Sequence, residues 1–171
     1  MGENLSVRRF RPANASRVRT LHEAAMRDIG AYIEDVPDDD LENVTETFLE
    51  RDGEFLVGEV DGRIVAMGGF QLLKGDHYIT NFLPELPETT VVLTRMRVDP
   101  AHQRQGYGQR IYEALEKRAR NRGYTTIVLD TMASQAAARG LYETNGFEKV
   151  GRERLEVFDD DFEMYVYRKS L

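Results

Sequence analysis

The sequence predicts a mixed α/β domain over residues 1–171, and three observations carry this prediction. Seven segments show the alternating or β-branched pattern typical of strands, and four segments place apolar residues at helical spacing. Clusters of Gly, Pro and Asp separate these segments, as turns do. The sequence has no repeats and no low-complexity linker, which predicts a single domain with the element order βααβββαβαββ.

The N-terminal part is expected to form a strand and two helices. Residues 5–10 alternate between apolar and polar side chains, and Asn14 or Ser16 can cap the helix that follows. The apolar residues expected on the inner face of that helix are Val18, Leu21, Ala25 and Ile29. Pro37 and three aspartates then break the chain, and the aspartates suit the positive end of a second helix over about 41–50. The residues expected to face inward from it are Leu41, Val44, Phe48 and Leu49.

A hairpin is expected next. Residues 54–60 and 63–73 have strand patterns and flank Asp61-Gly62, a dipeptide that strongly favours a two-residue turn. An irregular stretch with two prolines follows over 75–88. It is long for a connection, and long loops in compact domains are often functional.

The C-terminal part is expected to alternate strands and helices. Strands are predicted over 91–98, 125–131, 148–157 and 162–169, and a helix over 134–145. The strand over 125–131 is apolar enough to be central, and the last two strands form a hairpin around Asp159-Asp160-Asp161. One more helix follows the fourth strand, with an inner face made of Tyr107, Ile111, Leu115 and Ala119.

Composition excludes several classes of function. The hydrophobic share of 41% and the charged share of 31% are those of a globular protein. The net charge of -7 argues against nucleic acid as a partner. No apolar run reaches the roughly 20 residues of a membrane span, and the first residues lack the apolar core of a signal peptide, so we expect a cytoplasmic protein without a membrane partner. Without cysteine, and with scattered histidines, no metal site is expected.

The segment from Arg97 to Gly108 predicts an anion-binding site between a strand and a helix. Gly106 and Gly108 let the backbone turn tightly and approach a ligand, while the N–H groups that begin the helix favour negative charge. Further donors at the rim are Gln103, Arg104 and Gln105. The segment is not a P-loop, and Ile111 stands where a dinucleotide fingerprint needs its third glycine.

Two motifs resemble the GNAT N-acetyltransferase family. The run Gln-x-x-Gly-x-Gly over residues 103–108, after a strand that ends in Val-Asp-Pro, resembles its pyrophosphate loop. The pattern Gln135-x-x-Ala138-x-x-x-Tyr142-x-x-x-Gly146-Phe147 resembles its last helix, although many members have asparagine at the position of Gln135. Each motif alone also fits a plain glycine turn, a core tyrosine or a helix cap. Together they occur in the family's order, and the resemblance covers nearly the whole chain.

The resemblance implies a fold and a co-substrate. The fold is a central, mostly antiparallel sheet of about seven strands, flanked by four helices and splayed between the fourth and fifth strands. The co-substrate is acetyl-CoA as acyl donor, without a metal. The residues that the resemblance places against acetyl-CoA are Met96, Arg97, Val98, Gln103, Arg104, Gln105, Gly106, Tyr107, Gly108, Gln109, Gln135, Ala138 and Tyr142.

The implied reaction is direct attack of a primary amine on the thioester carbonyl in a ternary complex. The backbones of Met96 and Val98, at a bulge in the fourth strand, would stabilise the oxyanion, and Tyr142 would give a proton or a hydrogen bond to the leaving sulfur. The sequence does not single out one residue as the general base. The carboxylates near predicted element ends are Glu23, Glu34, Asp35, Asp99 and Asp130, and His22 and His77 are further options. His102 is expected to shape the coenzyme loop.

The acceptor stays open. In the family its pocket is built by the first two helices, the stretch over 75–88 and the last hairpin. The acidic run over 34–40 and the turn Asp159-Asp160-Asp161 could attract a cationic amine, but solvated surface charge is the simpler interpretation. Alternatives are a non-catalytic acyl-CoA sensor, a domain that no longer binds the cofactor, and a transferase for another donor such as succinyl-CoA, for which Arg95 and Arg97 lie on the right strand. A homodimer through the terminal strands is also open.

Overall fold

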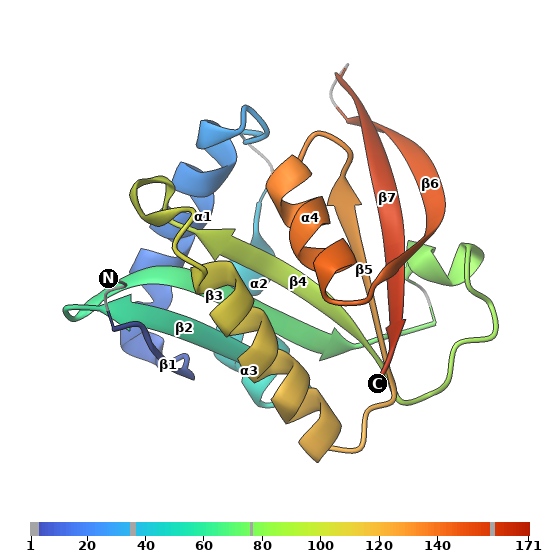
Figure 1. Cartoon of the computed structure of the whole chain (residues 1–171), viewed down its shortest axis with the longest axis horizontal. Coiled ribbons are helices and arrows are strands. Elements are labelled where there is room, and N and C mark those ends of the chain that lie inside the picture. Colours follow the sequence, from blue (N-terminus) through green and yellow to red (C-terminus); the bar gives the residue numbers. More distant parts are fainter. Residues whose placement is uncertain (1–3, 35–36, 76, 158–159) are drawn as a thin grey trace. The chain divides into compact units, whose positions relative to one another are not determined.

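The computed structural model describes residues 4–34, 37–75, 77–157 and 160–171. Its strands are β1 (Ser6–Arg9), β2 (Glu54–Val60), β3 (Arg63–Leu72), β4 (Thr90–Val98), β5 (Thr126–Met132), β6 (Glu148–Val157) and β7 (Asp160–Ser170). Its α-helices are α1 (Ala15–Asp28), α2 (Asp39–Glu42), α3 (Tyr107–Asn121) and α4 (Ala136–Thr144). This is the mixed α/β fold and the element order predicted from the sequence (Figure 1).

The strands pair in the order β1-β2-β3-β4-β5-β7-β6, so β5 is an interior strand with a neighbour on each side, as its apolar sequence predicted. Strands β1 with β2, β2 with β3, β5 with β7 and β6 with β7 pair antiparallel. Strands β4 and β5 pair parallel over a short stretch, Thr90–Val92 against Thr126–Val128. The hairpin between β2 and β3 turns at Asp61 and Gly62, whose φ angles of 51° and 79° are those of the primed turn that the dipeptide favours.

The chain forms two compact units. The first contains Met1–Gln71 and Thr94–Arg118, and the second contains Leu72–Leu93 and Ala119–Leu171. Strand β4 and helix α3 therefore each contribute residues to both units. The division into two units does not test the expectation of one domain over residues 1–171, which stays a prediction.

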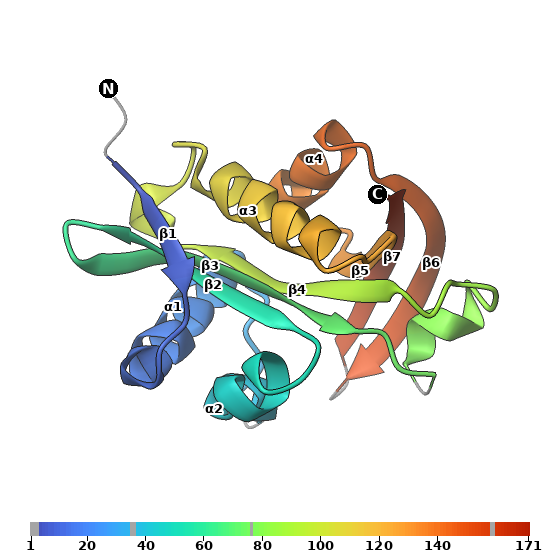
Figure 2. The ribbon, with the colours of Figure 1, turned by 90° about the horizontal axis from the view of Figure 1, so that it is seen from below.

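In the first unit the strands carry helices on both faces (Figure 2). Phe55 and Val57 of β2 face α1 and the segment around α2, where they join the buried cluster. The other members of that cluster are Phe10, Val18, Leu21, Leu41, Val44, Phe48, Ile64 and Met67. On the opposite face, Gly68 of β3 lies under Ile111 and Leu115 of α3. The absence of a side chain at Gly68 is what lets the helix approach this strand.

In the second unit, β7 separates two apolar layers. Val166 packs with Val92, Val128 and Ile79, the last from the short 3-10 helix η3 (Tyr78–Asn81). The next residue, Tyr167, points the other way and packs against Tyr142 of α4, with ring centroids 6.2 Å apart. Helix α4 and η3 thus cover opposite faces of this part of the sheet.

Two expectations about the helices were wrong in detail. The helix predicted over 41–50 is two pieces, α2 and a wider π-type turn η2 (Thr45–Leu49), because the backbone leaves the helical region at Asn43 (φ -137°, ψ 46°). Its inward residues are buried as predicted, Leu49 only partly. Ile29 is not on the inner face of α1: it follows the last residue of the helix and is 42% exposed.

Candidate functional site

Strand β4 contains a left-handed residue within the stretch expected to bind the acyl donor. Arg95 has a φ angle of 59°, which is uncommon for a residue other than glycine. Such a residue within a strand turns the following peptide away from the regular ladder, as at a β-bulge. That peptide carries the N–H of Met96. The backbone distortion therefore lies where the family resemblance places the bulge.

Two aspartates hold the guanidinium group of Arg95. Its Nε and Nη2 donate to the two carboxylate oxygens of Asp40, both at 2.8 Å, and Nη2 also lies 3.1 Å from Oδ1 of Asp38. Burial alone would lower the pKa of Arg95, but the hydrogen bonds and charges of Asp40 and Asp38 raise it above its usual value. Arg95 is therefore a fixed cation whose side chain is only 18% exposed.

His22 of α1 is buried beside this cluster. Its Nδ1 lies 3.2 Å from Nε of Arg97, and its Nε2 lies 3.3 Å from Nη1 of Arg95 and 3.6 Å from Oδ2 of Asp38. Burial first, and then the charges of Arg97 and Arg95, lower the pKa of His22 to about 4, although Asp38 and Asp40 act in the opposite direction. The ring is uncharged at neutral pH and lies against two guanidinium groups. His22 is therefore a weak proton acceptor.

The segment after β4 is anchored through Asp99. Its Oδ1 accepts a hydrogen bond from the N–H of Ala101 at 2.9 Å, which caps the short 3-10 helix η4 (Pro100–His102). Its Oδ2 accepts from Nη2 of Arg17 in α1 at 2.8 Å, and its N–H donates to the carbonyl of Val65 at 2.8 Å. Burial alone would raise the pKa of Asp99, but the bonds from Ala101 and Arg17 hold it below its usual value. Asp99 is therefore a structural carboxylate and a poor base.

The predicted cofactor loop is exposed and sharply turned. Residues 103–106 are exposed, and Arg104 and Gly106 have φ angles of 63° and 80°. A Cβ on Gly106 would meet no atom within 4 Å, so this position requires glycine for its backbone angle and not for space. At the end of the loop, the buried ring of Tyr107 stacks on His102, with centroids 6.5 Å apart. His102 thus shapes the loop, as expected.

Helix α3 begins at the end of this loop. Its first backbone hydrogen bond of the helical kind runs from the N–H of Arg110 to the carbonyl of Gly106 at 3.1 Å. The N–H groups of a helix's first turn have no acceptor within the helix, and they form a ready-made site for anions. The side-chain amide of Gln109 donates to Glu113 at 2.9 Å and is engaged within the helix.

The side chain of Met96 belongs to the apolar layer under α3. A Cβ added to Gly68 would clash with its sulfur, and would also come within 3.2 Å of Ile111 and Leu115. The role predicted for Met96 in oxyanion binding therefore falls on its backbone. Val98, two residues further along β4, is half-buried.

The remaining predicted residues lie in the second unit. Oε1 of Gln135 accepts hydrogen bonds from the hydroxyl of Thr131 at 3.0 Å and from the N–H of Met132 at 3.1 Å. These bonds fix the turn between β5 and α4. A contact of Gln135 with the pantetheine arm stays a prediction, as does the role of Ala138, which lies one turn before Tyr142 in α4.

Tyr142 is positioned by the end of its own helix. Gly146 has a φ angle of 88° and stops α4, and the N–H of Phe147 then donates back to the carbonyl of Tyr142 at 3.0 Å. The ring of Phe147 meets the ring of Tyr142 edge-on at 5.7 Å. The ring of Tyr142 is therefore held between Phe147 and Tyr167, with 6% of the residue exposed.

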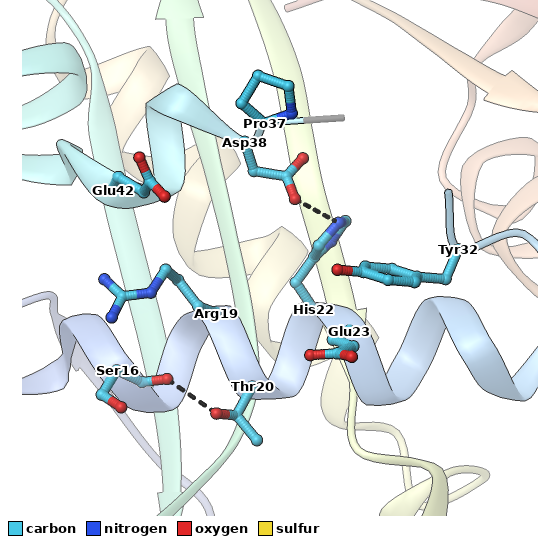
Figure 3. Close-up of a pocket in the computed structure, with 9 residues that line it drawn as sticks. All are labelled: Ser16, Arg19, Thr20, His22, Glu23, Tyr32, Pro37, Asp38 and Glu42. Carbon is cyan, nitrogen blue, oxygen red and sulfur yellow. Dashed lines mark hydrogen bonds and ion pairs between the residues drawn. The ribbon is translucent and has the colours of Figure 1, made fainter. Parts of the chain in front are cut away.

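A pocket of about 340 Å³ lies beside α1 (Figure 3). Its lining residues are Ser16, Arg19, Thr20, His22, Glu23, Tyr32, Pro37, Asp38 and Glu42. Figure 3 shows His22 and Asp38 pointing toward one another, with the ring of Tyr32 near the imidazole. Three carboxylates against the guanidinium of Arg19 make the wall of this pocket acidic.

The carboxylates expected near the first helix are paired. Glu23 and Glu34 each lie 2.9 Å from Nη2 of Arg27, and Asp35 falls outside the described residues. Asp159 of the acidic turn before β7 also falls outside them.

In the second unit, Asp130 accepts the hydroxyl hydrogen of Tyr78. Burial, and then the charge and hydrogen bond of Asp130, raise the pKa of Tyr78 well above its usual value. The ring of Tyr78 is stacked on His77, whose Nδ1 accepts from the N–H of Ile79 at 3.2 Å. Asp130 and His77 are thus engaged within the fold.

The sequence interpretation missed two pairs, Arg95 with Asp40 and Tyr78 with Asp130. Their members are 55 and 52 residues apart, so no local spacing marks them. One signal was available for the first pair. Arg95 and Arg97 share one face of a predicted strand, and half-buried cations on a strand require anions from elsewhere in the chain.

The described part of the chain covers residues 4–34, 37–75, 77–157 and 160–171. In that part of the chain, no three His, Asp or Glu side chains gather in a way that could hold a metal ion. None of its helices has the length and hydrophobicity needed to cross a bilayer.

Comparison with known proteins identifies relatives. Residues 17–147 match the family described as the acetyltransferase (GNAT) family. Human N-acetyltransferase 8 is 33% identical over 114 residues, which are 66% of this chain and 47% of that protein. The [ribosomal protein bS18]-alanine N-acetyltransferase of Escherichia coli is 35% identical over 80 residues, 47% of this chain and 54% of that protein. The chain thus spans about half the length of these relatives.

Solved structures share the fold. A GNAT-family acetyltransferase from Staphylococcus aureus Mu50 has a TM-score of 0.80 at 16% identity, over 98% of this chain and 99% of that one. The Salmonella typhimurium protein yncA, solved with its cofactor acetyl-CoA, has a TM-score of 0.78 at 20% identity, over 98% and 94% of the two chains. In this chain, the shared fold contains the three features described above: the left-handed residue in β4, the glycine turn before α3 and the helix that ends after Tyr142. Because the family match spans well over half of its residues, the chain belongs to the acetyltransferase (GNAT) family.

Proposed function

We propose that this protein transfers an acetyl group from acetyl-CoA to a primary amine by direct attack in a ternary complex. The observation that carries the proposal is the turn through Arg104 and Gly106, which leads into the first N–H groups of α3. An exposed glycine turn at the positive end of a long helix suits the pyrophosphate of coenzyme A. The family relationship and the relatives' names as N-acetyltransferases support the same activity.

Each group has one task in the proposed reaction. The residues over 103–109 bind the pyrophosphate, and β4 lies along the pantetheine arm. The backbone N–H groups of Met96 and Val98 stabilise the negative charge that develops on the acetyl oxygen. Tyr142 then supplies a proton or a hydrogen bond to the departing sulfur. A metal has no part in this scheme, and we place the protein in the cytoplasm.

The engaged carboxylates favour an acceptor that needs little help to lose its proton. An α-amine with a pKa near ~8 is about a tenth neutral at pH 7, whereas a lysine amine near ~10.4 is neutral in only about one molecule in a few thousand. Asp99, Asp130 and Glu23 are all paired within the fold. The related Escherichia coli enzyme is named for an alanine acceptor, so a peptide with a free N-terminal alanine is the first probe.

Calorimetric titration with acetyl-CoA tests the proposal. We expect saturable binding by the wild type and its loss in Gly108→Trp, because the indole would fill the space of the pyrophosphate. Gly75→Trp is the matched control for this titration alone, since a Cβ at Gly75 meets no atom within 4 Å and Gly75 lies far from the loop in sequence. Release of free thiol is then followed with the alanine peptide.

A sensor without catalysis is the second candidate, because it would also keep the loop. Binding of acetyl-CoA without thiol release for any amine in a broad screen would favour that reading. Absence of binding in a folded wild-type protein, in low and high salt, would exclude both. Titration with succinyl-CoA in parallel would reveal a different donor.

A further inference from the structure

The left-handed backbone conformation of Arg95 costs conformational free energy, which other contacts in the fold must offset. Residues other than glycine rarely occupy φ near 60°, and they persist there only where surrounding contacts over-determine them. Five of the nine residues of β4 are β-branched and favour the extended conformation. Something other than local preference must therefore hold Arg95.

The contacts of its side chain meet that need. Asp40 receives two hydrogen bonds from Arg95 at 2.8 Å, a fork geometry that fixes direction as well as distance. Asp38 adds a third at 3.1 Å. The side chains of Arg95, Asp40 and Asp38 are 18%, 19% and 28% exposed, so water screens these bonds less than at a free surface.

We call the ion pair of Arg95 with Asp40 and Asp38 the clamp. Its position connects it to the backbone of the proposed active site. Asp40 belongs to α2, and Asp38 is the residue directly before that helix. Arg95 lies immediately before Met96 in β4. The orientation of the peptide between Arg95 and Met96 depends on the backbone angles of Arg95. That peptide carries the N–H of Met96, which is proposed to stabilise the oxyanion.

We propose that Asp40, assisted by Asp38, is a positioning residue whose ion pair with Arg95 holds the left-handed backbone that aims the N–H of Met96. This inference rests on the proposed function. Asp40 touches neither acetyl-CoA nor the amine in this scheme. It acts through Arg95, and Arg95 acts through its own backbone.

Substitutions of Arg95 can separate the effect of its backbone conformation from the effect of its charge. Glycine adopts a positive φ without cost, so Arg95→Gly keeps the bulge without the clamp, whereas Arg95→Ala loses the clamp and resists the angle. We expect kcat of Arg95→Ala to fall below that of Arg95→Gly by roughly tenfold, which corresponds to about 1.4 kcal/mol of transition-state stabilisation. The dissociation constant of acetyl-CoA should change by less, because the loop over 103–109 is untouched.

Asp40→Ala provides the second arm. Asp40 is also one of the acidic residues in the first turn of α2, where negative charge is favourable, so the control must lose a charge from the same turn. We expect roughly a tenfold loss of kcat in the wild-type background and much less in the Arg95→Gly background, where the angle needs no clamp. Asp39→Ala is the matched control, because Asp39 is exposed in the same turn, and its kcat should equal that of the wild type.

Two outcomes would overturn the inference. Equal losses in Arg95→Gly and Arg95→Ala would mean that the guanidinium itself is needed, as for a carboxylated acyl group. An equal effect of Asp40→Ala in both backgrounds would mean that Asp40 does not act through the backbone of Arg95.

A readout without catalysis keeps this test apart from that of the proposed function. The φ-sensitive NMR couplings of residue 95 should report a left-handed residue in the wild type and an extended or averaged one in Asp40→Ala. An unchanged φ in Asp40→Ala would refute the clamp, whatever the enzyme's activity. Failure of the wild type to bind acetyl-CoA would instead count against the proposed function.

Discussion

At the scale of single residues, His22 links the stability of the fold to pH. Its pKa is lowered to about 4, mainly by burial and by the neighbouring charges of Arg97 and Arg95. As pH falls through 6.5 the unfolded chain binds a proton at His22, whereas the folded protein does so only near 4. The unfolded state therefore binds more protons between these values, and the stabilisation present above pH 6.5 is lost as pH falls toward 4.

The measurement is the urea midpoint at pH 7 and at pH 4.5, for the wild type and for His22→Gln. We expect the midpoint of the wild type to fall more steeply between the two values, because glutamine cannot take up a proton. Parallel pH dependence in the two proteins would show that His22 is already charged in the fold or that its environment loosens.

Tyr142 gives a second prediction at this scale. Its ring packs on Phe147 and Tyr167, so Tyr142→Phe keeps the packing and removes only the hydroxyl. We expect a kcat lower by about 10²-fold or more, within the usual range of general acid catalysis, with little change in the calorimetric affinity for acetyl-CoA. Leu141→Ala, one residue earlier in α4, is the control for a nonspecific disturbance of the helix. A kcat within twofold of the wild type for Tyr142→Phe would limit the tyrosine to packing.

Individual residues also show which parts of the candidate site could be predicted from the sequence and which could not. Gly106 was predictable, because a glycine before a helix has a local reason to be there. The partner of Arg95 was not, because its place in a predicted strand indicates that an anion is needed, whereas Asp40 alone resembles a solvated charge. Only the fold brings them within 2.8 Å. The same holds for Tyr78 and Asp130 in the second unit.

At the scale of elements, two glycines should respond in opposite ways to the same substitution. Gly140 lies within α4, is exposed, and would carry a Cβ without any atom within 4 Å. Gly140→Ala should therefore raise the free energy of unfolding by about 0.5–1 kcal/mol, through lower backbone entropy of the unfolded chain. Gly106 has the same free space but a φ of 80°, so Gly106→Ala should lower it by about 1–2 kcal/mol.

Urea unfolding of the two variants beside the wild type checks both signs. Because neither new methyl group meets a neighbour, only backbone conformation separates them. Stabilisation by Gly106→Ala would mean that the loop relaxes to negative φ, and binding of acetyl-CoA should then be measured again in that variant.

Elements with a strong local pattern were predictable to within a residue or two. Strand β2 begins and ends where its alternation does, and α3 buries the face marked by Tyr107, Ile111, Leu115 and Ala119. The segment around α2 was less predictable. Its apolar spacing is helical, but the side-chain amide of Asn43 bonds to the carbonyl of Asp39 at 2.9 Å and competes with the backbone, which interrupts the helix.

At the scale of the whole molecule, the prediction of one domain can be tested by cooperativity. Strand β4 and helix α3 each contribute to both compact units, so neither unit can unfold without breaking a continuous element. We expect one thermal transition, with coincident curves for the far-UV signal and for the near-UV signal of the tyrosines. Gly106→Ala and Gly140→Ala, one in each unit, should shift that single transition as a whole. Two transitions, each moved by only one variant, would assign the units separate stabilities.

The fold class was predictable because it depends on the order of elements, which local patterns encode. The mostly antiparallel sheet was expected from the family resemblance, but the order of its strands was not predicted, since no pattern in the sequence states which strand lies beside which. The short parallel contact between β4 and β5 is of this kind. It depends on partners 36 residues apart, such as Val91 and Ile127.

The anchoring of the loop through Asp99 also bears on the entropy of the coenzyme A binding proposed for it. Arg17, 82 residues earlier in the chain, helps to hold Asp99, and the stacking of His102 on Tyr107 holds the far end of the same loop. Much of the ordering that a mobile loop would have to undergo with its ligand is thus completed during folding. For the binding of coenzyme A proposed above, a residue of the first helix would therefore set part of the affinity for a ligand that it need never touch. Loosening it would shorten the lifetime of the complex more than it slowed its formation.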